Sequence, residues 1–112
     1  MLDIIGVKMY GRRGDDSDFV LFSLSKEVNF IEPLQISGNA GRTLAYHTST
    51  GSYFALHLMR DAKKAFKQFG FESFDSSTIV NRSKVKSIEP TDEGSIVQFF
   101  DGTRVHVRKK FS

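Results

Sequence analysis

Cysteine is missing from this chain of 112 residues. Its absence excludes disulfide bridges, thiolate metal sites and thiol catalysis, and it agrees with a reducing compartment. The sequence also lacks any apolar run near the roughly 20 residues that are needed to span a bilayer. A signal peptide would begin with basic residues before a long apolar core, whereas this chain has the acidic Asp3 near its start. We therefore expect a cytoplasmic protein without a membrane segment.

Residue groups that could support enzyme chemistry are weak throughout. The three histidines, His47, His57 and His106, lie too far apart for a short metal-binding motif. The acidic pairs at 15–16 and 92–93 fall in expected loops and have no positioned partner for acid–base chemistry. We therefore expect no enzyme, and we expect no cofactor, metal site or small-molecule substrate.

A glycine-rich stretch, residues 38–43 (GNAGRT), superficially looks like a phosphate-binding loop. A nucleotide site needs a lysine before the Ser/Thr, and it needs a helix behind the loop to direct backbone amides at phosphate. Neither feature is present, so the stretch is interpreted as a hairpin turn. Arg42 at its tip could still approach DNA.

Charge is distributed unevenly along the chain, whose formal net charge is +3. Residues 1–57 carry five basic and six acidic side chains, net −1, whereas residues 58–112 carry eleven basic and seven acidic side chains, net +4. This asymmetry suggests a polyanionic partner for the second half. Charge alone does not establish one, because many basic proteins are simply soluble.

Composition and pattern predict one mainly β domain that spans residues 1–112. With 39% apolar and 26% charged residues, the chain fits a single globular unit with a modest core. Apolar and β-branched runs between turn residues predict antiparallel strands. These runs lie at residues 3–10, 19–24, 28–32, 43–48 and 53–56, then at 71–80 as one extended segment, at 84–88 as a short strand or turn, and at 95–100 and 103–107.

The last two strands are expected to form a hairpin through Asp101-Gly102, a strong turn signal. His106 stands between two valines and should therefore point away from the core. Phe99 and Phe100 are both assigned to core packing.

One short amphipathic helix is predicted at residues 58–69. Its apolar side chains recur at three- and four-residue spacing, at Leu58, Ala62, Ala65, Phe66 and Phe69. Gly70 is a natural stop for this helix. The basic side chains of the helix lie off the apolar stripe, on a face that is either solvated or in contact with phosphate.

The order of these elements resembles the LytTR DNA-binding domain. The matching features are the helix followed by Gly70-Phe71, the stretch 77–81 (STIVN) with Val85 and Ile88, and the hairpin that continues into 107–111 (VRKKF). The resemblance covers about residues 18–111, and residues 1–17 form an N-terminal strand and loop. It implies elongated antiparallel β-sheets with little helix. It also implies a sequence-specific, double-stranded DNA-binding transcriptional regulator, similar to the output domains of bacterial response regulators, which read promoter direct repeats through loop residues in the major groove.

The resemblance assigns three residues of this chain to DNA contact, namely Asn81, Arg108 and, in the loop before a strand, Arg42. Asparagine can pair with adenine and arginine with guanine in the major groove. Family members commonly carry a His-Arg pair where Asp75-Ser76 stand here, which removes positive charge near the expected DNA face. Five more basic residues suit phosphate contacts, which set register and add salt-dependent affinity: Arg82, Lys84, Lys86, Lys109 and Lys110.

The residues alone leave alternatives open. Asn81 could cap a turn, and Arg108 could be a solvent-exposed cation at a strand edge. The main alternative function is a β-rich protein-interaction module without DNA binding, and another is a single-stranded nucleic-acid binder that stacks bases on phenylalanines. Repeated target sites would allow a homodimer on DNA. Because 112 residues cannot also hold a receiver domain, the chain is expected to be either a stand-alone regulator or a fragment.

Overall fold

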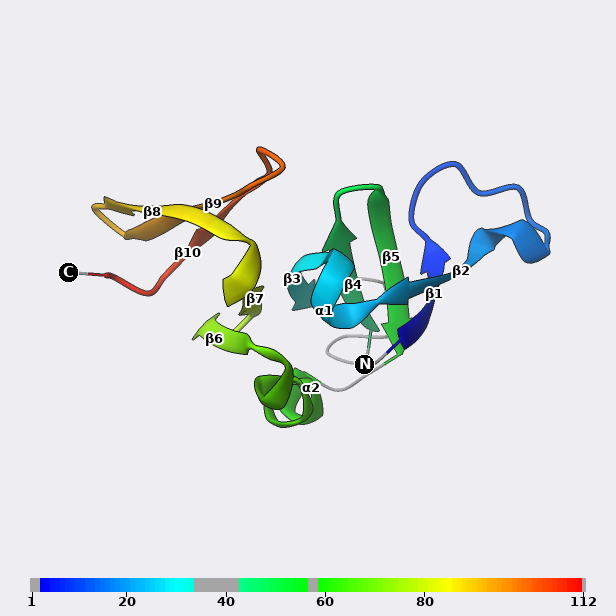
Figure 1. Ribbon diagram of the computed structural model, residues 1–112, viewed down its shortest axis with the longest axis horizontal. Coiled ribbons are helices and arrows are strands. Elements are labelled where there is room, and N and C mark those ends of the chain that lie inside the picture. Colours follow the sequence, from blue (N-terminus) through cyan, green and yellow to red (C-terminus); the bar gives the residue numbers. More distant parts are fainter. Residues whose placement is uncertain (1–2, 34–42, 57–58, 112) are drawn as a thin grey trace.

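The chain folds into two antiparallel β-sheets with little helix (Figure 1). The computed structural model describes residues 3–33, 43–56 and 59–111. The molecule measures 46 × 29 × 26 Å, which confirms the elongated, mainly β fold expected from the sequence. The expected turn at 38–41 and His57 lie outside the described residues. Within the described ranges, no helix is long and apolar enough to cross a membrane.

Seven strands form the larger sheet and three form the smaller one. The larger sheet consists of β1 (Asp3–Lys8), β2 (Phe19–Ser23), β3 (Val28–Pro33), β4 (Thr43–Thr48), β5 (Gly51–Leu56), β6 (Phe71–Asp75) and β7 (Thr78–Asn81). The smaller sheet consists of β8 (Val85–Thr91), β9 (Gly94–Phe99) and β10 (Arg104–Val107). The strand orders are β2-β1-β5-β4-β3-β7-β6 and β10-β9-β8. The helical segments are η1 (Asp16–Asp18), α1 (Leu24–Glu27), α2 (Met59–Ala65), η2 (Phe66–Phe69) and η3 (Arg82–Lys84).

The larger sheet contributes to two hydrophobic cores, one on each face. Successive side chains of a strand point to opposite faces, so Ile31 of β3 enters the first core and its neighbour Phe30 enters the second. Ile79 and Val80 of β7 are divided in the same way. Strands β3 and β7 are therefore buried on both faces, which explains their continuous apolar runs.

The predicted helix is confirmed over the residues that the structure describes. It runs as α2 and continues without a break as η2, and Ala62 and Phe66 are buried against the first core. Gly70 ends it with a positive φ of 89°, a conformation that glycine adopts without a steric penalty. Lys64 and Lys67 are exposed, as the stripe predicts, but Ala65 is exposed too, so its place on the buried stripe is wrong. In Figure 1 this helical segment lies beside β6.

A second, four-residue helix, α1, was not predicted, because four residues are too few to show a helical period. The prediction of a strand at 19–24 is wrong at its last residue, since β2 ends at Ser23. The Ser23 hydroxyl accepts a hydrogen bond from the Lys26 backbone N–H, and the Glu27 carboxylate accepts one from the Ser23 N–H. These reciprocal caps hold the turn between β2 and β3.

The segment 71–80 is a hairpin and not the single extended segment that was predicted. Strands β6 and β7 are joined at Ser76-Ser77, and the Asp75 carboxylate accepts a hydrogen bond from the Ser77 N–H at 3.0 Å. An aspartate that bonds the backbone two residues ahead supports a turn without glycine. The Asp-Ser-Ser sequence was the available signal for this turn. The apolar residues on both sides of it favoured the prediction of one continuous strand instead.

The C-terminal hairpin through Asp101-Gly102 is confirmed, with β9 paired to β10. His106 is exposed, as predicted, and Phe99 is fully buried. Phe100 is 69% exposed, so its assignment to the core is wrong. Adjacent strand residues face opposite ways, and Phe99 takes the inward position.

Strand β8 is longer than the predicted segment 84–88. It pairs with β9 from Val85 to Thr91 and includes Pro90. Proline is tolerated there because β8 lies at the edge of its sheet, where the missing N–H costs no ladder bond.

Candidate nucleic-acid interface

The turn between β6 and β7 lies against the segment that follows β10. The Asp75 carboxylate accepts a hydrogen bond from the Arg108 backbone N–H at 2.8 Å. Arg108 and Ser76 are both exposed. The fold therefore brings the end of the C-terminal hairpin to the tip of a hairpin far earlier in the chain.

Asp75 is held in its charged form. Burial alone would raise the pKa of its carboxyl, but hydrogen bonds from the backbone N–H groups of Arg108 and Ser77 and from the side chains of Thr78 and Ser77 outweigh burial and lower it below its ordinary value. A charged carboxylate accepts stronger hydrogen bonds than a neutral one. The backbone at Arg108 is consequently fixed at neutral pH, while the arginine side chain faces solvent.

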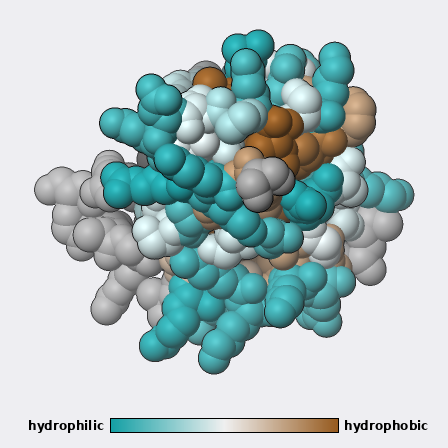
Figure 2. All heavy atoms as spheres, turned by 90° about the vertical axis from the view of Figure 1, so that its left-hand side faces the viewer, coloured by the Kyte–Doolittle hydropathy of each residue, from teal (hydrophilic) through white to brown (hydrophobic). Residues whose placement is uncertain are grey.

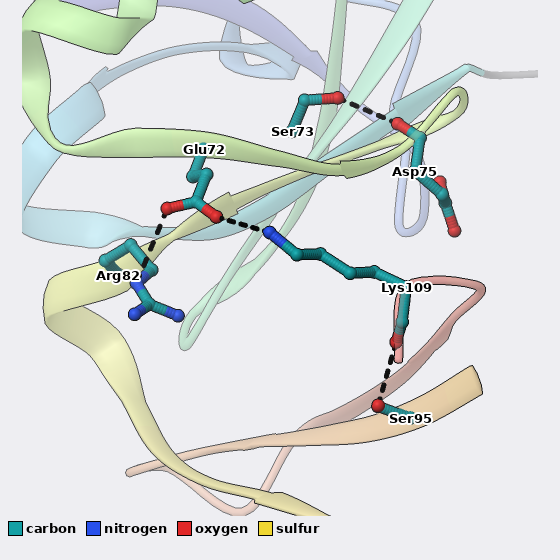
Figure 3. A network of polar contacts seen from close by, with 6 residues as sticks. All are labelled: Glu72, Ser73, Asp75, Arg82, Ser95 and Lys109. Carbon is teal, nitrogen blue, oxygen red and sulfur yellow. Dashed lines mark hydrogen bonds and ion pairs between the residues drawn. The ribbon is translucent and has the colours of Figure 1, made fainter. Parts of the chain in front are cut away.

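A groove of about 570 Å³ lies next to this contact, along β6. Glu72 stands in it between two cations, with Oε2 3.0 Å from the Lys109 Nζ and Oε1 3.8 Å from the Arg82 Nε (Figure 3). Four basic and one acidic side chain line the groove, together with three other residues. The lining residues are Lys63, Lys67, Gly70, Phe71, Glu72, Ser73, Arg82 and Lys109. We call this the β6 groove.

Aromatic rings lie beneath two of these cations. The Arg82 guanidinium carbon lies 5.5 Å from the Phe74 ring centroid. The Lys109 Nζ lies 5.6 Å from the same centroid and 5.1 Å from that of Phe111. Cations over ring faces gain electrostatic attraction while their charge stays accessible. Both cations therefore line the groove without being buried, since the Arg82 side chain is 50% exposed and the Lys109 side chain is 43% exposed.

Lys63 links the helix to the same hairpin tip. Its Nζ donates a hydrogen bond to the Ser76 backbone oxygen at 3.1 Å. Arg108, the tip of the β6–β7 hairpin and the β6 groove therefore form one continuous polar region. Figure 2 shows the end of the molecule that carries the smaller sheet. Hydrophilic side chains cover most of this end and surround a smaller hydrophobic area.

Asn81 lies inside the protein and has no exposed surface. Its Nδ2 donates to the backbone oxygens of Ser25 (3.0 Å) and Val28 (2.8 Å), and its Oδ1 accepts from the backbone N–H and the hydroxyl of Ser83. All hydrogen-bonding groups of the amide are thus in use. This is the geometry of a cap on η3, which was the alternative interpretation of this residue.

The other predicted residues are spread around this region. Lys84 is half-buried, and Lys86 and Lys110 are exposed. None of these three lysines is among the residues that line the β6 groove. Arg42 lies outside the described residues.

Arg108 also borders a second hollow, of about 440 Å³, together with Glu93 and His106. The His106 ring is 3.4 Å from the Thr91 hydroxyl, between its Nε2 and Oγ1. Arg108 therefore lines this second hollow and is not among the residues that line the β6 groove.

A separate row of side chains crosses β3, β4 and β5. His47 lies 2.7 Å from Glu32 through Nε2 and 2.7 Å from Ser52 through Nδ1, and its ring stacks on Phe30. The three residue types occur in acyl-transfer triads, where the serine bonds Nε2 and the carboxylate bonds Nδ1. The order here is reversed, and each bond joins neighbouring strands. The row is interpreted as cross-strand stabilisation of the sheet.

In the part of the chain that the structure describes, no group of three histidine, cysteine, aspartate or glutamate side chains could hold a metal ion. The arrangement around β6 instead offers cations, amides and hydroxyls on an open surface. Such groups suit an extended polyanion, since phosphates accept charged and neutral hydrogen bonds alike.

Comparisons with known proteins agree with this chemistry. The family model described as the LytTr DNA-binding domain matches residues 24–112. A solved structure of the LytTr DNA-binding domain from a Bacillus cereus protein, described as a methyl-accepting/DNA response regulator, superposes with a TM-score of 0.72. It shares 16% sequence identity, and the match covers 95% of this chain and 85% of that one. No curated protein is significantly similar in sequence.

Proposed function

The chain belongs to the LytTR DNA-binding domain family, and from this premise we propose that it is a sequence-specific, double-stranded DNA-binding transcriptional regulator. The family is one of DNA-binding domains without enzymatic activity, so DNA is its implied partner. A regulator of this kind acts in the cytoplasm.

One observation carries the proposal: Asp75 holds the backbone N–H of Arg108 at the tip of the β6–β7 hairpin, and Arg108 is exposed. An arginine on a fixed backbone can pair with the O6 and N7 atoms of guanine in the major groove. The exposed hydroxyls of Ser76 and Ser77 lie at the same tip. We propose that this tip enters the major groove and reads bases.

Phosphate contacts are assigned to the basic residues around that tip. Arg82 and Lys109 line the β6 groove. Lys84, Lys86 and Lys110 lie outside its lining and would add further contacts. Such contacts would set the register of the protein on the duplex and would make its affinity depend on salt. Arg42, which directly precedes β4 in the sequence, is retained as a further contact.

Asn81 receives a different part in this proposal. Because its amide is buried and fully hydrogen-bonded, we propose that it supports the backbone before η3 and does not pair with a base. Its effect on DNA binding would then pass through the fold.

Selection from randomised double-stranded DNA by the purified protein tests the proposal. Enrichment of a short motif that recurs as a direct repeat is expected, because the resemblance to this family implies paired target sites. Light scattering of the protein on the selected DNA would then show whether two copies bind as a homodimer. Failure to enrich any sequence would count against specific reading.

A protein-interaction module is the second candidate, and a different surface favours it. Ile5 and Leu21 face each other across β1 and β2 and are 67% and 64% exposed, and the nearby Phe19 is 58% exposed. Apolar side chains gathered on a surface often mark a protein contact. Absence of any affinity for duplex DNA at low salt would favour this candidate.

A further inference from the structure

The β6 groove holds one acidic residue, Glu72, among its four cations. Each carboxylate oxygen of Glu72 faces one cation, Oε2 facing Lys109 and Oε1 facing Arg82. The Glu72 side chain is 44% exposed. Ion pairs as exposed as these contribute little to protein stability. The fold therefore does not depend on them, and another anion can replace the carboxylate.

The other two cations of the groove are not matched by a carboxylate. Lys67 is exposed and forms no ion pair within the described ranges. Lys63 donates its described hydrogen bond to a neutral backbone oxygen, that of Ser76. With four basic side chains and one acidic side chain, the lining has an excess of three positive charges. The groove is open and is large enough for a phosphate group.

We propose that the β6 groove binds a backbone phosphate of duplex DNA, and that Glu72 is a built-in counter-ion which this phosphate displaces. The inference rests on the proposed function and extends it to a residue that opposes binding. A phosphodiester oxygen takes over the hydrogen bond that Lys109 gives to Glu72 and the ion pair that Glu72 forms with Arg82, and Lys63 and Lys67 add positive field from the helix. No covalent step is involved.

The placement of Glu72 gives it a role in specificity. It stands on β6 three residues before Asp75, the residue that fixes Arg108, and its partner Lys109 directly follows Arg108. A DNA backbone that crosses the groove therefore passes beside the base-reading tip. Because Glu72 weakens the phosphate contact on every sequence, it lowers non-specific affinity and leaves discrimination to Arg108.

The test compares Glu72→Gln with the matched variant Glu89→Gln. Both changes remove one negative charge, and Glu89 is an exposed residue of β8 that does not line the groove. Affinity for a short duplex of random sequence is measured by fluorescence anisotropy over a series of salt concentrations. Glu72→Gln is expected to bind about three to ten times more tightly at low salt, with a slope of log K against log salt steeper by about one. Glu89→Gln should change affinity less than about twofold, since an exposed charge outside the groove is screened.

A second measurement examines the groove without DNA. Inorganic phosphate is titrated into the wild type and Glu72→Gln while backbone amide signals are followed by NMR. Shifts at Gly70, Phe71 and Ser73 that saturate at lower phosphate in Glu72→Gln are expected, because the competing carboxylate is gone.

The outcomes separate this inference from the proposed function. If the wild type binds duplex DNA and the two glutamine variants behave alike, the counter-ion role of Glu72 is overturned while DNA binding stands. Phosphate titrations that leave the groove amides unchanged in both proteins also overturn it. If the wild type binds no duplex at any salt concentration, the proposed function itself fails and this inference fails with it.

Discussion

The carboxylate of Asp75 accepts a hydrogen bond from the backbone N–H of Arg108 over 2.8 Å, across 33 positions of the sequence. This bond joins the tip of the β6–β7 hairpin to the segment that leaves β10. It involves only the backbone N–H of Arg108, so it fixes the chain at this position without using the guanidinium. Pre-positioning of this kind lowers the entropy that a side chain loses when it binds.

Replacing Arg108 by alanine should remove base discrimination and leave the fold intact. Specific affinity for the selected DNA should fall by about 1–3 kcal/mol, because one bidentate contact to guanine is lost. Arg104→Ala is the matched control, since Arg104 is exposed and lies at the other end of β10. Anisotropy titrations with selected and random duplexes measure both. Equal losses in the two variants would argue for a general charge effect in place of base reading.

Replacing Asn81 by alanine should destabilise the protein. The change leaves the backbone oxygens of Ser25 and Val28 without their donor and removes the acceptor for Ser83, so the free energy of unfolding should fall by about 2–4 kcal/mol. Urea denaturation measures the loss. Ser83→Ala, which breaks only the exposed end of this network, should cost about 1 kcal/mol or less. A variant as stable as the wild type that has lost specific binding would restore direct contact as the role of Asn81.

Replacing Lys109 by alanine should weaken binding to every duplex by a similar factor. A lost phosphate contact lowers the slope of log K against log salt by about 0.9. Lys26→Ala removes the same charge from an exposed residue of α1 that does not line the β6 groove and has no assigned DNA contact, and it should lower the slope much less. Salt titrations of both variants decide this point. An unaltered slope for Lys109→Ala would mean that Lys109 serves only its ion pair with Glu72.

Acid should weaken the contact between the two sheets through Asp101. Burial would raise the pKa of this carboxyl, but hydrogen bonds from Ser49, Thr103 and Asn29 outweigh burial and lower it well below its ordinary value. Because the unfolded chain has the higher pKa, about 3.9, the stabilisation is complete above about pH 5 and is lost as the pH falls toward the folded value.

The Asp101→Asn variant tests this pH dependence by urea denaturation at neutral and acidic pH. The variant should be less stable than the wild type at pH 7, because the charged acceptor is gone. Its stability should then decline less between about pH 5 and pH 3, since the residue no longer titrates. Parallel curves for the two proteins would show that other carboxylates dominate acid unfolding.

Local signals predicted the elements that depend on near neighbours. The apolar stripe at residues 58–69 and the stop at Gly70 identified the helix, and Asp101-Gly102 identified the last hairpin. Short features escaped, such as the four-residue helix α1 and the turn at Ser76-Ser77. Their signals are hydrogen bonds that the side chains of Ser23 and Asp75 accept from the backbone N–H groups of Lys26 and Ser77, and such bonds carry no periodicity.

For the candidate site, the sequence showed which residue types are present, but it did not show which side chains are exposed or which residues they contact. The basic character of the segment after β10 was visible in the sequence, and Arg108 and Lys109 are indeed exposed. Nothing in the sequence placed Glu72 between Arg82 and Lys109, because Glu72 and Lys109 are 37 positions apart in the chain. Phe100 and Phe99 are alike in type, yet only Phe99 is buried, because strand register selects one face.

By itself, the sequence determined the β-rich class, the amphipathic helix and the positive charge of the second half, because spacing and composition act over a few residues. Tertiary structure alone decided which polar groups stay accessible. Asn81 became an interior cap because β7 runs between two hydrophobic cores, where an amide must find partners in the backbone of a distant turn. Arg108 remained at the surface because Asp75 binds only its backbone and leaves its charge in water. Burial of that cation would have been costly.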